Sequence, residues 1–144
     1  MPKILVALDA TPIADAVLSA GIAHARWMRA EIVLLRAILP PPELPVEVFA
    51  KTPETLAELA ERNARTELTV ALAEIPNDIV ARIRVDVGAP WRVICDVAKE
   101  EDVALVVLGA HDHRLLDAVT GTNTTRVVNH IDRTVAVVRR PRPE

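Results

Sequence analysis

Residues 103–108 form a continuous apolar run, Val-Ala-Leu-Val-Val-Leu, and this run restricts the fold of the chain more than any other feature. A strand with one face in water alternates apolar and polar residues, so an unbroken apolar strand is expected to be covered on both faces. Such strands occur in parallel sheets, because the helices that connect parallel strands pack on both sides of the sheet. The run therefore predicts a central parallel strand between two layers of helices.

Strand-like and helix-like segments alternate along the remaining sequence. Further strands are expected where apolar and β-branched residues gather, at residues 4–8, 31–39, 79–87 and 134–138. Four helices are expected. The first starts with Thr11 as its cap and Pro12 in its first turn, and the others lie over residues 54–75, around residues 91–98, and in a segment that includes Val127 and Val128. A chain of 144 residues supports one core. The pattern predicts a single α/β domain, a doubly wound five-stranded parallel sheet with helices on both faces (Rossmann-like).

Local patterns add detail to this prediction. In the first helix, one set of residues at helical spacing is expected to pack on the sheet: Ile13, Ala16, Val17, Ala20, Ala23, His24 and Trp27. Residues 79–87 alternate apolar side chains with Arg82, Arg84 and Asp86, which is typical of a half-exposed strand at a sheet edge. Residues 40–53 contain five prolines and form either a flap over the strand ends or a plain connector.

Composition and charge exclude several classes of partner. The formal net charge is -3 and aromatic residues make up 2% of the chain, so neither charge nor base stacking favours nucleic acid. No apolar run reaches the length of a membrane span, and the start of the chain does not resemble a secretory signal. Cys95 is alone, which excludes an internal disulfide, and its apolar helical surroundings are typical of a core position. We expect a cytoplasmic protein without membrane insertion.

The carboxyl end of the 103–108 strand has the features of a phosphate site. The strand runs into Gly109, and after a polar loop Gly121-Thr122-Asn123 opens a helix. Backbone N–H groups in such a loop and the dipole of the helix both favour an anion. In a doubly wound sheet, ligands bind beyond the carboxyl ends of the strands, where Asp9, Ala37 and Gly88 are also expected. These features point to a nucleotide.

Five segments together resemble the universal stress protein family. They are residues 4–9 (Ile-Leu-Val-Ala-Leu-Asp), 87–90 (Val-Gly-Ala-Pro), 106–111 (Val-Val-Leu-Gly-Ala-His), 121–123 (Gly-Thr-Asn) and 135–139 (Val-Ala-Val-Val-Arg). The resemblance spans the chain and implies an adenine nucleotide alpha hydrolase-like fold. It implies ATP or another adenine nucleotide as ligand, with or without Mg2+. It also implies a stress-response sensor or regulator that acts on an unidentified protein partner.

The same resemblance implies which residues hold the nucleotide. Asp9 and the backbone at Ala37 would hold the adenosine, residues 109–111 the ribose and first phosphates, and residues 121–124 the terminal phosphates. The full candidate set is Ala7, Leu8, Asp9, Ala37, Leu108, Gly109, Ala110, His111, Asp112, Arg114, Gly121, Thr122, Asn123 and Thr124. Structural alternatives stay open: Asp9 or Thr122 as a helix cap, and Gly109 or Gly121 as tight-turn residues.

Asp112 departs from the nucleotide-binding pattern of the family, which has a glycine at this position. The loop is also one residue shorter than the commonest spacing, although shorter loops ending in Gly-Ser-Asn occur in a nucleotide-binding branch. Two unit charges about 4 Å apart repel by roughly 4 kcal/mol at an effective dielectric of about 20. A magnesium ion, Arg114 folded over the site, or a backbone that turns the carboxylate outward would offset this repulsion. The alternative is a nucleotide-independent dimeric interaction module whose site is blocked by Asp112.

Catalysis and metal binding receive less support from the sequence. No serine or cysteine has an evident base partner, and the loop lacks the lysine that stabilises transferring phosphate in P-loop enzymes. Slow ATP hydrolysis is the most that we expect. His111, Asp112 and His113 are of metal-ligand types, but alternating neighbours in a loop rarely suffice without a further ligand. We therefore assign neither a catalytic residue nor a metal site.

The final strand, residues 134–138, is apolar and would leave an unpaired sheet edge, which proteins normally cover or pair. In the universal stress protein family this strand pairs across a two-fold axis. The resemblance therefore implies a closed homodimer that forms through Val135 and Val137.

Overall fold

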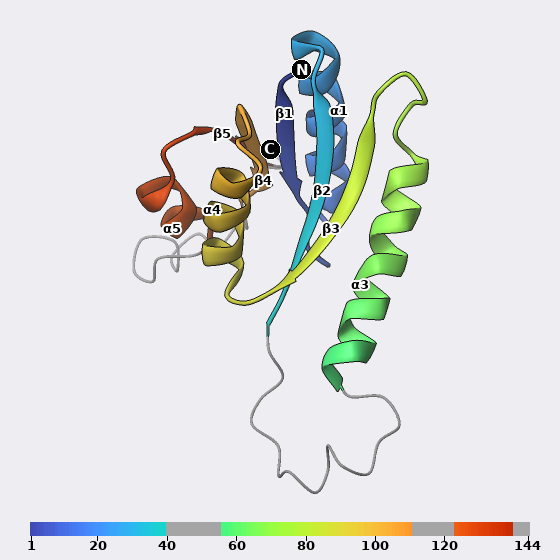
Figure 1. Cartoon of the computed structure of the whole chain (residues 1–144), viewed down its shortest axis with the longest axis vertical. Coiled ribbons are helices and arrows are strands. Elements are labelled where there is room, and N and C mark those ends of the chain that lie inside the picture. The colour runs from blue at the N-terminus through green and yellow to red at the C-terminus, as the bar shows by residue number, and fades with distance from the viewer. Residues whose placement is uncertain (40–55, 111–122, 140–144) are drawn as a thin grey trace, which may run out of the picture.

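The computed structural model describes residues 1–39, 56–110 and 123–139 of the 144-residue chain. They contain a five-stranded parallel sheet with the order β3-β2-β1-β4-β5 (Figure 1). Each strand begins and ends within two residues of its expected range: β1 Lys3–Ala7, β2 Glu31–Ile38, β3 Ala81–Val87, β4 Leu105–Gly109 and β5 Thr134–Val138. The predicted parallel sheet is confirmed.

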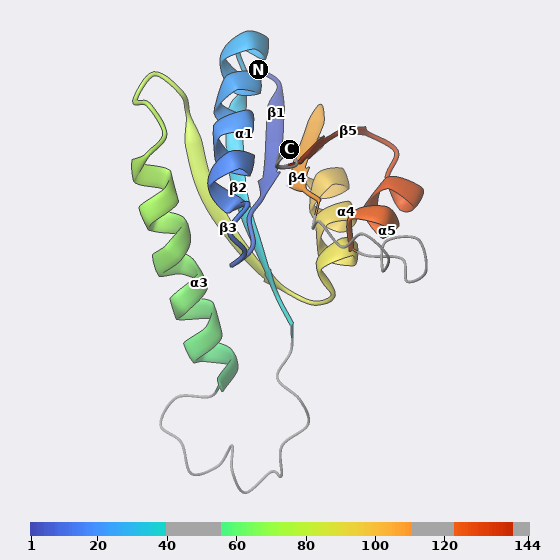
Figure 2. The same cartoon turned by 180° about the vertical axis from the view of Figure 1, so that it is seen from behind.

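Helices cover both faces of this sheet, as the doubly wound prediction requires. α1 (Ala14–Met28) and α3 (Leu56–Ala73) lie on one face, and α4 (Pro90–Glu100) and α5 (Asn123–His130) lie on the other (Figure 1, Figure 2). Each connection from one strand to the next along the chain contains one of these helices. Among the described residues, no helix has both the length and the apolar composition of a membrane span.

The alternation of side chains along β1 divides the core into two clusters. Ile4 and Val6 pack in the cluster beneath α1 and α3, while Leu5 packs in the cluster beneath α4 and α5. All three side chains are 0% exposed. β4 follows the same rule, with Val107 in the first cluster and Val106 in the second. Both faces of these central strands must be apolar, which explains their unbroken aliphatic runs.

The side of α1 that faces the sheet agrees with the predicted one at Ile13, Ala16, Val17 and Ala20, and departs from it in the last turns of the helix. Its buried residues are Val17, Leu18, Gly21 and Ala25, whereas Trp27 is 84% exposed. The predicted packing of Trp27 on the sheet is therefore wrong. Alanine occurs all around this helix, so apolar spacing did not single out one side. The branched side chains of Val17 and Leu18 mark the side that is buried.

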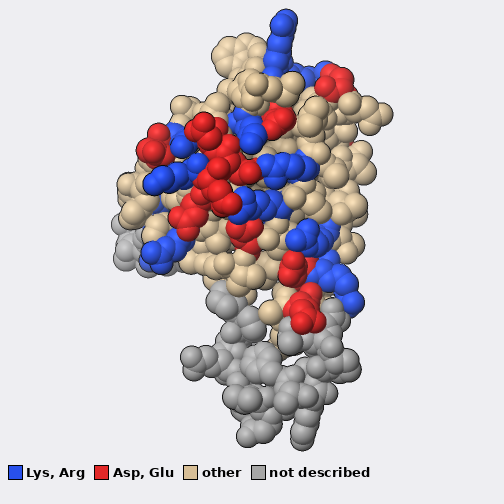
Figure 3. Space-filling view, viewed as in Figure 1, with Lys and Arg blue, Asp and Glu red and all other residues tan. Residues whose placement is uncertain are grey.

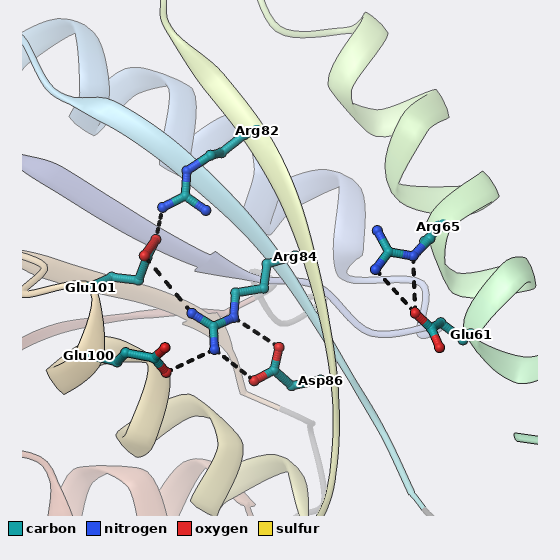
Figure 4. Close-up of polar contacts among 7 residues, drawn as sticks. All are labelled: Glu61, Arg65, Arg82, Arg84, Asp86, Glu100 and Glu101. Carbon is teal, nitrogen blue, oxygen red and sulfur yellow. Dashed lines mark hydrogen bonds and ion pairs between the residues drawn. The ribbon is translucent and has the colours of Figure 1, made fainter. Parts of the chain in front are cut away.

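β3 is the half-exposed edge strand that its alternation predicts. On its polar side, Arg84 donates hydrogen bonds to Asp86 and to Glu100 of α4, both at 2.8 Å, and Arg82 pairs with Glu101, the C-cap residue of α4 (Figure 4). The bond to Asp86, followed by that to Glu100, raises the pKa of Arg84 above its ordinary value. Figure 3 shows basic and acidic side chains interspersed on this face. Charges of this kind discourage another strand from pairing with the edge.

Gly21 allows α1 to approach the sheet closely, and its replacement tests that approach. A Cβ atom at Gly21 would lie 2.6 Å from Cγ2 of Val6. Alanine in place of glycine in mid-helix normally adds about 1 kcal/mol of stability, but overpacking a core costs about 1–3 kcal/mol. We therefore expect Gly21→Ala to lower the free energy of unfolding measured in urea.

The control for this substitution is Ser19→Ala, at an exposed position of the same helix. It is expected to leave the free energy of unfolding unchanged or slightly raised, because serine is the weaker helix former. A Gly21→Ala variant that is more stable than the original chain would contradict the close approach of α1 to β1.

Candidate functional site

β1 ends earlier than the strands beside it, and a gap opens at its carboxyl end. The paired register of β1 with β2 stops at Ala7 and Leu35, and the N–H of Leu8 donates one further bond to the Leu35 carbonyl at 2.9 Å. β2 continues beside β3 as far as Ile38. Because β4 lies on the other side of β1, the gap coincides with the point where the strand order reverses. Ligands of doubly wound sheets bind at such a point.

A cavity of about 110 Å³ occupies this gap, and we call it the switch-point pocket. Three strand ends and the first turns of α4 and α5 supply its wall: Ala7, Leu8, Asp9, Leu35, Ala37, Pro90, Ile94, Leu108, Gly109, Asn123 and Thr124. The structure thus brings the described candidate residues together, with Ala110 as the exception. Leu35, Pro90 and Ile94 were not among the candidates.

Ala110 has a place in the sheet rather than in the wall of the pocket. It is buried, and its N–H donates to the Val138 carbonyl at 2.9 Å, which extends the pairing between β4 and β5. The other candidates, His111, Asp112, Arg114, Gly121 and Thr122, lie outside the described residues. The proline-containing segment 40–53 also lies outside them, so its two interpretations stay predictions.

Gly88 turns the chain from β3 into α4 and thereby places Pro90 and Ile94 at the pocket. Its φ of +150° is a conformation that favours glycine, and its N–H donates to the Ile38 carbonyl at 2.8 Å. Pro90 then starts α4, where its missing N–H costs nothing. Ile94 lies one turn further along the same side of the helix. In the sequence, Gly-Ala-Pro at residues 88–90 indicated where α4 starts. It did not indicate which side of α4 faces the pocket, so Pro90 and Ile94 were missed.

Asp9 shapes the turn between β1 and α1 at the rim of the pocket. Its Oδ1 accepts a hydrogen bond from the Thr11 N–H at 3.0 Å and another from the Thr11 hydroxyl. The predicted Thr11 cap is wrong, because α1 begins at Ala14 and Ile13 holds the cap position without a side-chain cap bond. The Thr11 hydroxyl is engaged by Asp9 instead. Asp9 therefore fixes a turn and lines the pocket at the same time.

Gly109 and Thr124 join the end of β4 to the start of α5. The Thr124 hydroxyl donates to the Gly109 carbonyl at 2.9 Å. A Cβ atom at Gly109 would lie 2.9 Å from Cγ2 of Ile13 and 3.0 Å from Cγ2 of Val17. Gly109 is therefore required for close packing against α1, rather than for the tight turn that was the structural alternative. The first N–H groups of a helix have no partner within it, so the first turn of α5, with Asn123 and Thr124, favours an anion.

An aromatic contact fixes α5 against α4. The rings of Trp91 and His130 lie 4.8 Å apart at an angle of 42°, and the guanidinium carbon of Arg126 lies 5.9 Å from the Trp91 ring centre. Nδ1 of His130 lies 2.7 Å from the Arg126 carbonyl oxygen, so it is a donor in this arrangement. These contacts position the helix whose first turn lines the pocket.

A larger cavity of about 240 Å³ lies at the opposite end of the sheet. Met1, Arg26, Ala30 and Asp78 are among the residues that line it, and they lie near the amino ends of β1, β2 and β3. Helix N-termini and exposed strand carboxyl ends, which bind ligands in this class of fold, meet at the other end. We therefore place the candidate site at the smaller pocket. It lies at the end of the sheet where this class of fold binds ligands, and this position outweighs the larger volume of the other cavity.

Cys95 lies in surroundings that disfavour its reactive form. Burial, followed by the charges of Asp96 and Asp132, raises the pKa of the Cys95 thiol and so disfavours the reactive thiolate. Cys95 packs beside the core cluster under α4, as expected from the sequence. Within residues 1–39, 56–110 and 123–139, no group of three or more acidic, histidine or cysteine side chains could hold a metal ion.

The chain is similar to one protein family over nearly its whole length. A model of the universal stress protein family matches residues 1–139. No curated protein matches the chain significantly. The family match covers every described strand and helix, including all segments that meet at the switch-point pocket.

Solved structures share the same fold over almost the whole chain. Universal stress protein UspA from Lactobacillus plantarum has a TM-score of 0.72 at 23% identity, covering 96% of this chain and 97% of that one. A universal stress protein in complex with cAMP has a TM-score of 0.67 at 20% identity, covering 95% and 96%. The universal stress protein from Archaeoglobus fulgidus in complex with dAMP has a TM-score of 0.68 at 19% identity, covering 95% and 96%.

Proposed function

The chain belongs to the universal stress protein family, and we propose that it binds an adenine nucleotide in the switch-point pocket and serves as a stress-response sensor or regulator. The observation that carries this proposal is the convergence of residues 7–9, 35, 37, 108–109 and 123–124 on one cavity at the reversal of strand order. The occupied and empty states would differ in their contacts with a protein partner, because a ligand acts as a signal when it favours one conformation.

The apolar part of the pocket suits the adenosine portion of the ligand. Ala37 and Ile94 offer apolar surface to the base, and backbone groups at the end of β2 offer hydrogen bonds. The Asp9 carboxylate at the rim is an acceptor for ribose hydroxyls. The described walls enclose about 110 Å³, less than the roughly 300–1,000 Å³ of a site for a drug-sized ligand. The pocket is therefore assigned to one portion of the nucleotide rather than to all of it.

The phosphates are assigned to the first turn of α5 and to the loop that precedes it. Asn123 and Thr124 belong to that turn, and the N–H groups and the dipole at the start of a helix attract an anion. His111, Asp112, Arg114, Gly121 and Thr122 complete this half of the proposed site. Related proteins in complex with cAMP and with dAMP support an adenine nucleotide as the class of ligand. ATP with Mg2+ is the proposed form, because a magnesium ion offsets the charge of Asp112.

Asp112 makes the proposal easy to test. We expect nucleotide-stripped protein to bind ATP in a calorimetric titration, with tighter binding when Mg2+ is present, because the ion shields the phosphates from the Asp112 carboxylate. Asp112→Gly should bind ATP with less dependence on Mg2+. ADP and AMP are titrated in parallel, after mass spectrometry of the denatured preparation for nucleotide carried through purification.

The matched control is Asp102→Gly. Asp102 is exposed, lies away from the pocket lining and has a φ of +53°, so glycine fits its backbone. It should behave as the original chain does. If the original chain binds no adenine nucleotide and Asp112→Gly does, Asp112 is the block and the chain is a nucleotide-independent interaction module. If neither binds, the nucleotide proposal is wrong.

A homodimer through β5 is the second part of the proposal. β5 pairs with β4 along one side and forms one edge of the described sheet, opposite to β3 (Figure 1). The β3 edge carries arginines, whereas β5 consists of Thr-Val-Ala-Val-Val. An apolar edge of this kind exposes unpaired backbone groups, and a second copy of the strand would satisfy them about a two-fold axis.

Val137→Lys is expected to produce monomers, because it would place two lysines near the two-fold axis. Light scattering should then give a mass near 15.7 kDa instead of about twice that value, as expected for a two-fold pair. Val87→Lys, at the end of the opposite edge strand, is the control and should remain dimeric. An unchanged dimer mass for Val137→Lys would exclude this interface.

A further inference from the structure

Arg36 is a mostly buried charge in β2, next to the pocket but on the other face of the sheet. Its neighbours Leu35 and Ala37 line the switch-point pocket. Because side chains alternate along a strand, Arg36 lies on the face that α1 and α3 cover. Its side chain is 16% exposed. A guanidinium with so little access to water requires partners within the protein.

Two contacts provide these partners and connect three elements. Nε of Arg36 donates a hydrogen bond to the Leu8 carbonyl at 2.9 Å, and Nη1 forms an ion pair with the Glu67 carboxylate of α3 at 2.7 Å. Leu8 is the residue at which β1 leaves β2, since its N–H makes the last bond to Leu35. The Arg36 side chain thus ties the end of β1 to β2 beyond the last paired residues.

The corner formed by Leu8 and Asp9 needs such a tie. A third cavity, of about 180 Å³, lies on the α1 and α3 face, and both residues line it as well as the switch-point pocket. The corner is therefore a thin wall between two hollow spaces. Leu8 is 7% exposed, whereas Ile4, Leu5 and Val6 are 0% exposed, so packing holds the corner less completely than it holds the centre of β1, and hydrogen bonds contribute more to its position.

We propose that Arg36 is a positioning residue of the nucleotide site and that, through Glu67, it couples occupancy of the pocket to α3. This inference rests on the proposed nucleotide binding. Arg36 lies on the face of the sheet opposite to the switch-point pocket. It acts by fixing the position of Leu8 and Asp9, which line that pocket. Because coupling between two sites is reciprocal, a nucleotide that stabilises the corner also stabilises the docking of α3.

The first measurement is ATP affinity by calorimetry. Arg36→Met keeps most of the aliphatic stem and removes both contacts, and we expect its Kd to rise roughly tenfold, as for the loss of one hydrogen bond from a charged donor. Arg36→Lys retains a charged donor and should recover part of this loss. Arg65→Met breaks the exposed Arg65–Glu61 pair on α3 (Figure 4) and should leave the Kd unchanged.

The second measurement separates positioning from general stability. ATP should slow hydrogen exchange in peptides of α3 in the original chain and in Arg65→Met, but not in Arg36→Met. Ile4→Val truncates a buried side chain at the far end of β1, and we expect it to lower the melting temperature about as much as Arg36→Met does. It should change neither the Kd nor the effect of ATP on α3. If Arg36→Met does not fold, Glu67→Gln carries the exchange test, since it weakens the link to α3 and leaves the bond to Leu8.

The outcomes distinguish this inference from the proposed function. If the original chain binds ATP and Arg36→Met binds equally well, with the same exchange response in α3, Arg36 has no positioning role and the nucleotide site stands. If Ile4→Val weakens binding as much as Arg36→Met does, the effect is one of stability and the inference is wrong. If the original chain binds no adenine nucleotide, the proposed function fails and this inference fails with it.

Discussion

The early end of β1, between two neighbouring strands that continue past it, is the constraint on which the rest of the structure depends. Ile4, Leu5 and Val6 are completely buried, so two core clusters fix the strand in place. β2 and β4 both continue past it in their pairing with the outer strands. The gap therefore opens at the reversal of strand order, where the first turns of α4 and α5 also lie. Most of its wall is aliphatic side chain and backbone, and the few polar side chains include Asp9 and Thr124.

Small residues set how closely the helices approach this gap. Gly21 and Gly109 let α1 lie against β1 and β4, since a Cβ atom at either would come within 3.0 Å of a side chain opposite. Gly88 turns the chain so that α4 begins over the ends of the strands. The Thr124 hydroxyl holds the start of α5 on the end of β4. Each of these contacts lies close to a candidate residue, so the packing of the helices and the shape of the pocket are set together.

The sheet was predictable from sequence because its signals are local. An unbroken apolar run marks β4, and alternation marks the edge strand β3. The carboxyl ends of parallel strands meet at one edge, which was enough to bring Asp9, Ala37 and Gly109 together. The errors have physical causes. The burial of Trp27 was predicted wrongly because alanines surround α1, and the Thr11 cap was wrong because its hydroxyl binds Asp9. Arg36 was missed because its partner Glu67 is remote in sequence, and no local pattern encodes such a contact.

The central claim is that the gap beyond β1 is where the ligand binds, and amide chemical-shift mapping tests it most directly. A titration of ATP and Mg2+ into ¹⁵N-labelled protein should shift the signals of Leu8, Ala37, Gly109 and Asn123, which lie in the pocket wall. The signals of Arg26, Ala30 and Asp78, around the larger cavity at the other end of the sheet, should stay in place. Shifts concentrated around that larger cavity, or an unchanged spectrum at millimolar ATP, would contradict the claim.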